Sequence, residues 1–236
     1  MIRGDILQSY LTHMKNLKGW ESVKDSTKER LLSFSRGHNI SEDTILYLEG
    51  QADVPIFIVI KGYAILSKFS EKGGEKILYI FSEGEFINEL AVDFQKTSNS
   101  TRALKDSMLI SIMAKDLLKL MEEDFNLNLI VLRSLSKKVR RTQRQALNLG
   151  RLKTGQRIAS RLWKLSRDYG VLQKDGSILI DLPINQSDIG AMVGTSRETV
   201  SRFIKKLENE DVLYLKGHKI VIKDRKALLN HVKLDD

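Results

Sequence analysis

Residues 186–207, QSDIGAMVGTSRETVSRFIKKL, constrain the fold more than any other part of the chain. They fit two short helices around a tight turn: Gly190 lies where the helices would cross, and Gly194 follows the first helix, where a left-handed cap is needed. At about 100° per residue, the second helix has an apolar arc and an opposite polar arc. The apolar arc holds Val200, Phe203, Ile204 and Leu207, and the polar arc holds Arg197, Glu198, Ser201, Arg202 and Lys205. This pattern predicts a helix-turn-helix whose second helix enters a DNA groove.

The polar arc carries side chains that can read base edges in the major groove. Arginine can donate two hydrogen bonds to guanine, glutamate can accept one from cytosine, and serine can do either. The candidate base readers are Arg197, Glu198, Ser201 and Arg202, and the candidate DNA contacts of this helix also include Ser196, Thr199 and Lys205. Two alternatives stay open. Thr195 and Glu198 also fit a capping box, and each arginine can simply be a solvated surface charge.

Length and composition limit the class of protein. A chain of 236 residues with 42% hydrophobic residues can bury two modest cores, which fits two domains. Cysteine is absent, so disulfides, thiol switches, cysteine zinc sites and cysteine-held iron–sulfur clusters are excluded. The apolar run Ile56–Ile60 is too short to span a bilayer, and the first ten residues lack the apolar core of a signal peptide. We expect a soluble, cytoplasmic protein.

The net charge of +9 is unevenly distributed along the chain. No acidic residue occurs between Asp124 and Asp168, and this basic block contains Arg133, Lys137, Lys138, Arg140, Arg141, Arg144, Arg151, Lys153, Arg157, Arg161, Lys164 and Arg167. Such a block favours attraction to the phosphate backbone of DNA and a steep dependence of binding on salt. For any single member, keeping a long helix solvated is the alternative interpretation.

The first half of the chain changes its pattern near Ile40. Residues 1–36 have apolar positions at helical spacing, which predicts short helices. After them, apolar segments alternate with glycine-containing turns, and a further group of strands is expected from about Thr101 to Met113. The alternating segments are Ile45–Leu48, Ile56–Ile60, Tyr63–Phe69 and Lys76–Phe81. The spacing predicts a small antiparallel β-roll or barrel.

Residues 117–150 return to helical periodicity with a seam in steps of three and four. The seam consists of Leu132, Leu135, Val139, Thr142, Ala146 and Leu149, the spacing of facing positions in a two-stranded coiled coil. We interpret it as a dimer interface. The alternative, packing of the helix on its own barrel, is favoured near Phe125 and Leu129.

After the dimer helix in the sequence, the pattern predicts a helix over Thr154–Tyr169. It also predicts short strands at Ile178–Leu182 and Val212–Lys223, before and after the helix-turn-helix. Residues 215–219 form a basic wing whose Lys216 and Lys219 are candidate phosphate contacts. The fold class is therefore α+β. The expected domains are a sensing β-roll with N-terminal helices (1–116), a dimerisation helix (117–150) and a winged helix-turn-helix (151–236).

The stretch from Ile189 to Arg202 closely resembles the recognition motif of the Crp/Fnr family of bacterial transcription regulators. The resemblance implies that Arg197, Glu198 and Arg202 contact bases of a palindromic half-site with a TGA-like core. It also implies a homodimer, a cyclic-nucleotide-binding-like β-roll and RNA polymerase as a partner. Because a two-fold dimer presents two recognition helices about one DNA turn apart, we expect an inverted-repeat site.

Gly84–Leu90 resembles the phosphate-binding cassette of this family, with Glu89 matching the residue that holds the ribose hydroxyl. Asn88 replaces a glycine, and Thr97 followed by Ser98 stands where an arginine should neutralise the phosphate; an ungapped register gives Asn99 and Ser100 instead. On the dimer helix Thr142 matches a nucleotide contact, but Gln143 departs from the expected serine, and a seam role is favoured for Thr142. The candidate effector residues are Asn88, Glu89, Leu90, Thr97, Ser98 and Thr142. Losing the charge-assisted contact should weaken cyclic AMP binding by roughly ten- to a hundredfold, so we expect another effector or none.

Two rival classes fit the sequence less well. A cupin-type enzyme would need a histidine and carboxylate cluster, whereas the four histidines, His13, His38, His218 and His231, are scattered without metal-ligand spacing. We expect no bound metal and no enzymatic activity. A non-specific architectural DNA-binding protein would explain the charge, but not four base-reading side chains on one helix face. We therefore expect a sequence-specific, homodimeric transcription regulator that binds double-stranded DNA.

Overall fold

The computed structural model describes residues 4–71 and 73–232, and the chain forms two compact units. The first comprises Met1–Phe69 and Leu78–Thr142, and the second Ser70–Ile77 and Gln143–Asp236. The long helix α4 (Phe125–Arg151) is thus divided between them. Among the described residues, no helix combines the length and the apolarity that crossing a bilayer requires.

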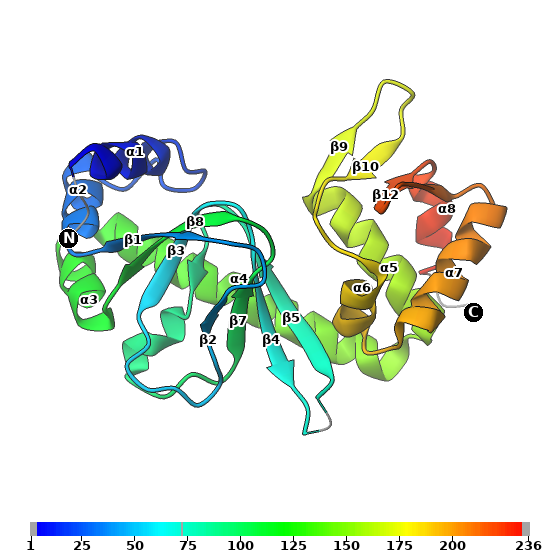
Figure 1. The fold of residues 1–236 in the computed structure, drawn as a ribbon, viewed down its shortest axis with the longest axis horizontal. Helices are drawn as coiled ribbons and strands as arrows, with labels where there is room; N and C mark the ends of the chain where they lie inside the picture. The colour runs from blue at the N-terminus through cyan, green and yellow to red at the C-terminus, as the bar shows by residue number, and fades with distance from the viewer. Residues whose placement is uncertain (1–3, 72, 233–236) are drawn as a thin grey trace. The chain divides into compact units, whose positions relative to one another are not determined.

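The first unit is built on two four-stranded sheets (Figure 1). One has the order β1 (Arg36–Ile40), β8 (Ser107–Ile112), β3 (Ile56–Lys61) and β6 (Phe86–Ile87), and the other β2 (Ile45–Tyr47), β7 (Ser100–Ala103), β4 (Ala64–Phe69) and β5 (Glu75–Phe81). β3 is buried from Ile56 to Ile60, as a central strand covered on both faces should be. A cluster that includes Tyr47, Phe57, Tyr79 and Phe81 forms one core. The predicted β-roll is confirmed.

Two N-terminal helices, α1 (Gly4–Lys15) and α2 (Asp25–Ser33), belong to the first unit and contribute to one of its hydrophobic cores. Trp20, which lies between them, is buried and stacks on Phe86 with ring centroids 5.3 Å apart. Its indole N–H donates to the Gly84 carbonyl at 2.9 Å. This hydrogen bond satisfies the polar end of a ring that is otherwise surrounded by apolar side chains, and it holds the helical segment against the loop before β6.

The helix predicted as one piece over 117–150 is two helices, α3 (Ala114–Glu123) and α4, which meet at the buried residue Asp124. The Asp124 carboxylate accepts from the Asn126 amide at 3.0 Å, which caps α4. It also accepts from the Lys24 amide at 3.1 Å and the Thr27 hydroxyl at 2.8 Å, which closes the start of α2. Burial alone would raise the pKa of Asp124, but these hydrogen bonds outweigh it and lower the pKa.

The predicted seam of α4 is largely exposed within this single chain. Leu132 and Val139 are each 55% exposed, and Thr142 and Ala146 are exposed as well. Leu135 is half-buried against the chain's own core, and the side chain of Leu149 lies outside the described residues. The first turns of α4, near Phe125 and Leu129, do pack on the chain's own core, as the alternative interpretation expects: Leu127, Ile130 and Val131 make the contacts, while Phe125 itself is 70% exposed. The seam's role as a dimer interface stays a prediction.

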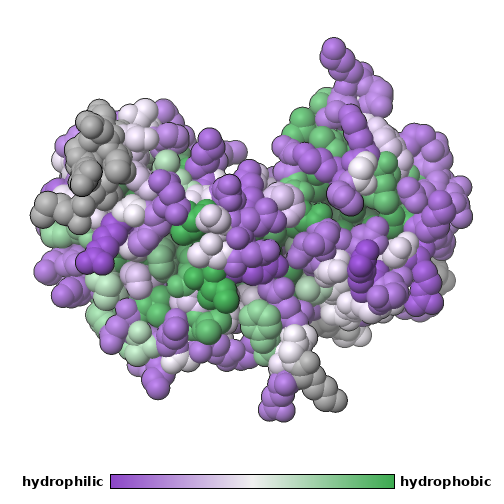
Figure 2. Space-filling model, in the orientation of Figure 1, coloured by the Kyte–Doolittle hydropathy of each residue, from purple (hydrophilic) through white to green (hydrophobic). Residues whose placement is uncertain are grey.

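The second unit contains a helix-turn-helix and a small sheet. Its helices are α5 (Thr154–Asp168), α6 (Gln186–Val193), α7 (Arg197–Asn209) and α8 (Arg225–Asn230). Its antiparallel sheet has the order β11 (Leu213–Lys216), β12 (Lys219–Ile222), β10 (Ile178–Ile180) and β9 (Gly170–Leu172). Neither β9 nor α8 is predicted from the sequence. Figure 2 shows apolar surface, in green, over the β9–β10 hairpin. Two apolar residues of β9 are exposed, Val171 by 47% and Leu172 by 73%.

Candidate DNA-binding site and effector site

The turn between α6 and α7 is closed by two glycines. Gly194 ends α6 with φ 74°, the left-handed region that favours glycine, and its amide donates to the Gly190 carbonyl at 2.8 Å. The Thr195 amide donates to the same carbonyl at 3.0 Å. A Cβ atom on Gly190 would lie only 2.7 Å from the Thr195 carbonyl oxygen. Both predicted glycine roles are confirmed, and the close approach fixes where α7 begins.

The start of α6 is fixed by a reciprocal capping box. The Asn185 side chain accepts from the Asp188 amide at 3.0 Å, and the Asp188 carboxylate accepts from the Asn185 amide at 2.8 Å. Two backbone donors that a helix start leaves unpaired are thereby satisfied. The first helix of the pair is therefore held at both ends, which gives α7 a rigid support.

α7 has the two faces that the sequence predicts. Val200, Ile204 and Leu207 are at most 1% exposed and pack into the second unit, while Phe203 is half-buried. The exposed residues of the opposite face are Arg197, Glu198, Ser201, Arg202 and Lys205. A polar surface on a helix whose other side is fully packed is available for contact with DNA.

The first turn of α7 differs in detail from the predicted capping box. Ser196, not Thr195, is the N-cap, and it accepts from the Thr199 amide at 3.3 Å. A hydrogen bond from its own backbone amide, and then one from the Ser196 hydroxyl, lowers the pKa of Glu198. The alternative capping box from Thr195 to Glu198 is therefore not formed with Thr195 as the cap. The carboxylate still lies at the positive end of the helix, where a negative charge is favoured.

Thr199 connects the helix cap to one candidate base reader. Its hydroxyl oxygen lies 3.2 Å from that of Ser196 and accepts from the Arg202 guanidinium at 3.4 Å. Thr199 is half-buried, whereas Ser196 and Arg202 are exposed. The arrangement places Arg202 on the outer surface of the helix with its donors directed toward solvent and Thr199.

The predicted wing is the β11–β12 hairpin, which turns at Gly217 and His218. Gly217 has φ 60°, and Lys216 and Lys219 face each other across the turn. Both lysines are exposed, but Lys219 pairs with Asp181 at 2.7 Å. Lys219 would have to exchange this surface ion pair for a phosphate, a small cost for an exposed pair.

Several members of the basic block use their charge inside the protein. Arg157 donates to the Val193 carbonyl at 3.1 Å, the Leu152 carbonyl at 3.0 Å and the Thr154 hydroxyl at 3.2 Å. Arg161 is buried, and Arg167 pairs with Asp168 at 2.8 Å. For Arg157 and Arg161 the structural role replaces the phosphate contact that the charge count suggests, whereas the Arg167 pair is exposed like that of Lys219.

Most of the candidate effector residues have partners within the chain or are exposed. Asn88 adopts φ 61°, and its side-chain amide donates to the carbonyls of Val54 at 3.1 Å and Pro55 at 3.2 Å. The Thr97 hydroxyl donates to the Leu48 carbonyl at 2.7 Å and accepts from the Gln51 amide at 3.0 Å. Leu90, Ser98 and Thr142 are exposed. Thr97 thus closes a turn of the chain and supplies no positive charge for a phosphate.

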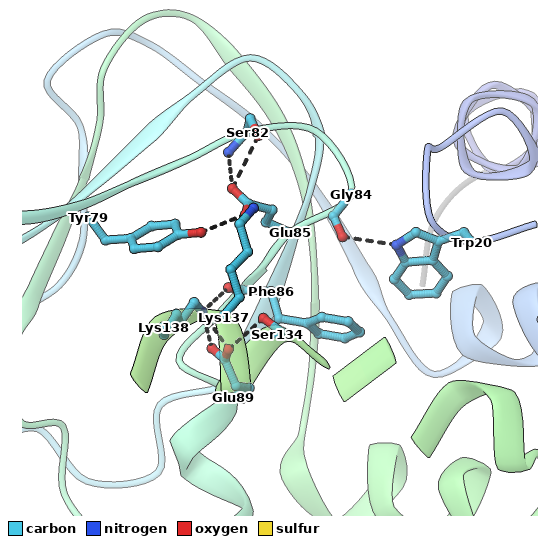
Figure 3. Close-up of polar contacts among 10 residues, drawn as sticks. All are labelled: Trp20, Tyr79, Ser82, Gly84, Glu85, Phe86, Glu89, Ser134, Lys137 and Lys138. Atoms are coloured by element: carbon cyan, nitrogen blue, oxygen red, sulfur yellow. Dashed lines mark hydrogen bonds and ion pairs between the residues drawn. The ribbon is translucent and has the colours of Figure 1, made fainter. Parts of the chain in front are cut away.

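Glu89 is buried, and its carboxylate accepts hydrogen bonds from side chains of α4 (Figure 3). The Ser134 hydroxyl donates to it at 2.8 Å, and the Lys138 ammonium contacts both of its oxygens. Lys138 also donates to the Phe86 carbonyl at 2.7 Å. Burial lowers the pKa of Lys138, and the facing Glu89 carboxylate offsets only part of this effect.

A second carboxylate, Glu85, lies beside this cluster (Figure 3). It accepts from the Tyr79 hydroxyl at 2.7 Å, the Ser82 amide at 2.8 Å and the Lys137 ammonium at 2.6 Å. Burial alone would raise the pKa of Glu85, but these partners, led by Lys137, lower it.

Sequence reasoning missed Ser134, Lys137 and Lys138 as members of this site. The i, i+4 spacing of Ser134 and Lys138 puts both on one helix face, but nothing local indicates a carboxylate 49 residues earlier.

Two of the residues nominated for a cyclic nucleotide are therefore engaged in contacts within the chain. A cyclic phosphate needs a cationic partner, and Thr97 is neutral and committed to backbone groups. The ribose-binding candidate Glu89 is already paired with Lys138. Among the described residues, no group of three or more histidines and carboxylates is arranged to hold a metal ion.

Residues 156–230 match the family model of the Crp-like helix-turn-helix domain, and residues 38–124 match that of the cyclic nucleotide-binding domain. The chain belongs to the Crp/Fnr family of transcription regulators. It is 29% identical over 201 residues to the cAMP-activated global transcriptional regulator CRP of Pasteurella multocida, covering 84% of this chain and 95% of that protein. The corresponding regulator of Haemophilus influenzae is 27% identical over 202 residues, covering 84% and 89%.

Solved structures of this family share the fold. The c-di-GMP responsive global regulator CLP of Xanthomonas campestris matches with a TM-score of 0.75 and 24% identity, over 85% of this chain and all of that chain. FixK2 of Bradyrhizobium japonicum matches with a TM-score of 0.74 and 22% identity, over 86% and 99%. The predicted Crp/Fnr membership and fold class are confirmed, and the chain is a transcription regulator with a helix-turn-helix DNA-binding domain rather than a member of an enzyme family.

Proposed function

We propose that this regulator binds an inverted-repeat DNA site as a homodimer, with one α7 helix reading each half-site. The exposed polar face of α7 supports the proposal most directly, because Arg197, Glu198, Ser201 and Arg202 project from a helix whose opposite side is buried. Arginine pairs with guanine and glutamate with cytosine in the major groove. The half-sites would lie about 34–36 Å apart, one turn of DNA.

The exposed stripe on α4 supports the homodimer. Leu132 and Val139 are large apolar side chains, each 55% exposed, and they lie seven residues apart, the heptad spacing of a coiled coil. A second copy of the same stripe would cover both. The promoter-bound dimer would act through RNA polymerase, a partner inferred from the family resemblance alone.

The effector of this regulator is not cyclic AMP in our proposal. The neutral Thr97 and the paired Glu89 both argue against a cyclic phosphate ligand. We expect added cyclic AMP to leave the affinity for DNA unchanged.

Fluorescence anisotropy with a palindromic duplex carrying TGA-like half-sites tests the proposal, with a scrambled duplex of equal length as the reference. We expect the palindrome to bind more tightly at every salt concentration, and sedimentation to give two protein chains per duplex. Arg202→Ala should reduce this preference, whereas Lys119→Ala, an equal loss of charge on α3, should not. Equal affinity for both duplexes would instead favour an architectural DNA-binding protein.

A further inference from the structure

The strongest unassigned feature is the pairing of a buried carboxylate in the β-roll with the long helix. Glu89 begins the 3₁₀ turn η1 (Glu89–Asp93), which follows β6, and both of its oxygens contact the ammonium of Lys138 on α4. The Ser134 hydroxyl, one turn earlier on the same helix, adds a hydrogen bond of 2.8 Å. A buried carboxylate is stable only when it is paired and hydrogen-bonded, and here α4 supplies both the charge and the hydroxyl.

Lys138 is held on its other sides as well. Its ammonium donates to the Phe86 carbonyl and lies 4.6 Å from the centre of the Phe81 ring and 5.6 Å from that of Tyr79. Aromatic faces attract a cation, most strongly when it is removed from water. The side chain is 18% exposed, so the ammonium is enclosed by the roll it contacts. Figure 3 shows Lys138 of α4 converging with Phe86 and Glu89 from the segment around β6.

A parallel set of contacts lies beside this pair. Lys137 pairs with Glu85, and the Arg141 guanidinium lies 4.5 Å from the centre of the Tyr79 ring. Lys137 is 62% exposed, and Glu85 keeps hydrogen bonds from Tyr79 and Ser82 without it. The two ion pairs therefore differ in kind: the outer one is exposed to solvent, and the inner one pairs with a carboxylate whose side chain is only 3% exposed.

We propose that Lys138 is a positioning residue that takes the place of an effector, so that the regulator holds its DNA-binding form without a small-molecule ligand. Lys138 contacts Glu89 and the rings of the roll, and α4 continues from the first unit into the second at Gln143. When Lys138 fixes α4 to the roll, the exposed stripe of Leu132 and Val139 keeps one position for pairing with a second copy of the chain. This inference rests on the proposed function, since it concerns what sets the affinity of the dimer for its inverted repeat.

The test measures DNA affinity of full-length protein freed of nucleotide, with and without cyclic AMP. Wild-type protein should bind the inverted repeat equally in both conditions. Lys138→Met should bind roughly 5- to 150-fold more weakly, the usual range of coupling between sites. Lys138→Arg keeps a cation that can pair with a carboxylate and should stay close to wild type. Lys119→Met, which removes a lysine on α3 whose side chain is 64% exposed, is the control and should also stay close.

A loss of folding is separated from a loss of positioning by a second variant. Glu89→Gln has nearly the same shape as the native side chain and can still accept the Ser134 hydrogen bond. Thermal unfolding of each variant gives its folded fraction, and each DNA affinity is calculated per folded protein. Weakened binding by folded Glu89→Gln supports the inference. A wild-type protein that needs cyclic AMP to bind, or folded Lys138→Met and Glu89→Gln proteins that bind like wild type, would overturn it while leaving the proposed function standing. Wild-type protein without any sequence preference would refute both.

Discussion

Replacing Gly190 by alanine tests whether the close crossing of α6 and α7 sets the position of the recognition helix. The added Cβ would lie 2.7 Å from the Thr195 carbonyl oxygen, whereas real Cβ contacts essentially never fall below 3.0 Å. The turn must therefore move by a few tenths of an ångström. Because the contact is a backbone atom, no side-chain rotation can relieve it.

The expected cost follows from two opposing effects. Alanine in a helix interior is favoured over glycine by up to about 1 kcal/mol, whereas overpacking of a tight contact costs about 1–3 kcal/mol. The overpacking dominates, because the Gly190 carbonyl also accepts from the Gly194 and Thr195 amides, and all three groups must shift together. We expect a net loss of about 1–2 kcal/mol in the free energy of unfolding and weaker binding to the inverted repeat.

Gly150→Ala is the matched control, since a Cβ there would meet nothing within 4 Å and Gly150 is also helical. It should leave stability unchanged or raise it by up to about 1 kcal/mol. Urea unfolding should therefore show a lower stability for Gly190→Ala and an equal or higher stability for Gly150→Ala. DNA affinity should fall in Gly190→Ala only. If Gly190→Ala is as stable as wild type and binds the inverted repeat equally well, the crossing does not set the position of α7, and this reasoning is refuted.

Four further changes test other parts of the structure. Arg202→Ala should weaken binding by about 1–3 kcal/mol and relax the preference for one base pair, as a panel of substituted duplexes would measure. Lys216→Ala should weaken binding to all duplexes alike and reduce the salt slope by about 1; a sequence-dependent effect would contradict its role as a phosphate contact. The lowered pKa of Asp124 stabilises the fold above its ordinary value of 3.8, and this contribution should be lost as the pH falls through the lower folded-state pKa. Acid unfolding of Asp124→Asn should lack that component, and an unchanged acid profile would argue against the capping role. Val139→Asp should shift the sedimentation of the protein from dimer to monomer, whereas an unchanged dimer would exclude the α4 stripe as the interface.

The helix-turn-helix was predictable because its signals are local. Two glycines mark the crossing and the cap, and the apolar positions from Val200 to Leu207 repeat with the period of a helix. The β-roll was predictable for a similar reason, since glycine-containing turns separate its short strands. The sequence leaves the cap of α7 open, because Thr195 and Ser196 are both good cap residues and only the tertiary position of the turn decides for Ser196.

The failures concern contacts between distant residues. The break at Asp124 was missed because apolar spacing continues across it, and its partners Lys24 and Thr27 lie about a hundred residues earlier in the chain. Glu89 was nominated as an effector contact, whereas Lys138 was counted only as part of a basic block. Charge counting does not distinguish a lysine that faces solvent from one that neutralises a buried carboxylate.

The position of Asp124 has a consequence for how the protein is made. α2 has no cap of its own, since the Lys24 side chain makes no capping hydrogen bond, and the acceptor that closes this helix lies 100 residues later. An uncapped helix start is less stable by about 1 kcal/mol, and α2 has only nine residues. During synthesis of the chain, the start of α2 can therefore gain the hydrogen bonds to Asp124 only after about a hundred further residues have been added.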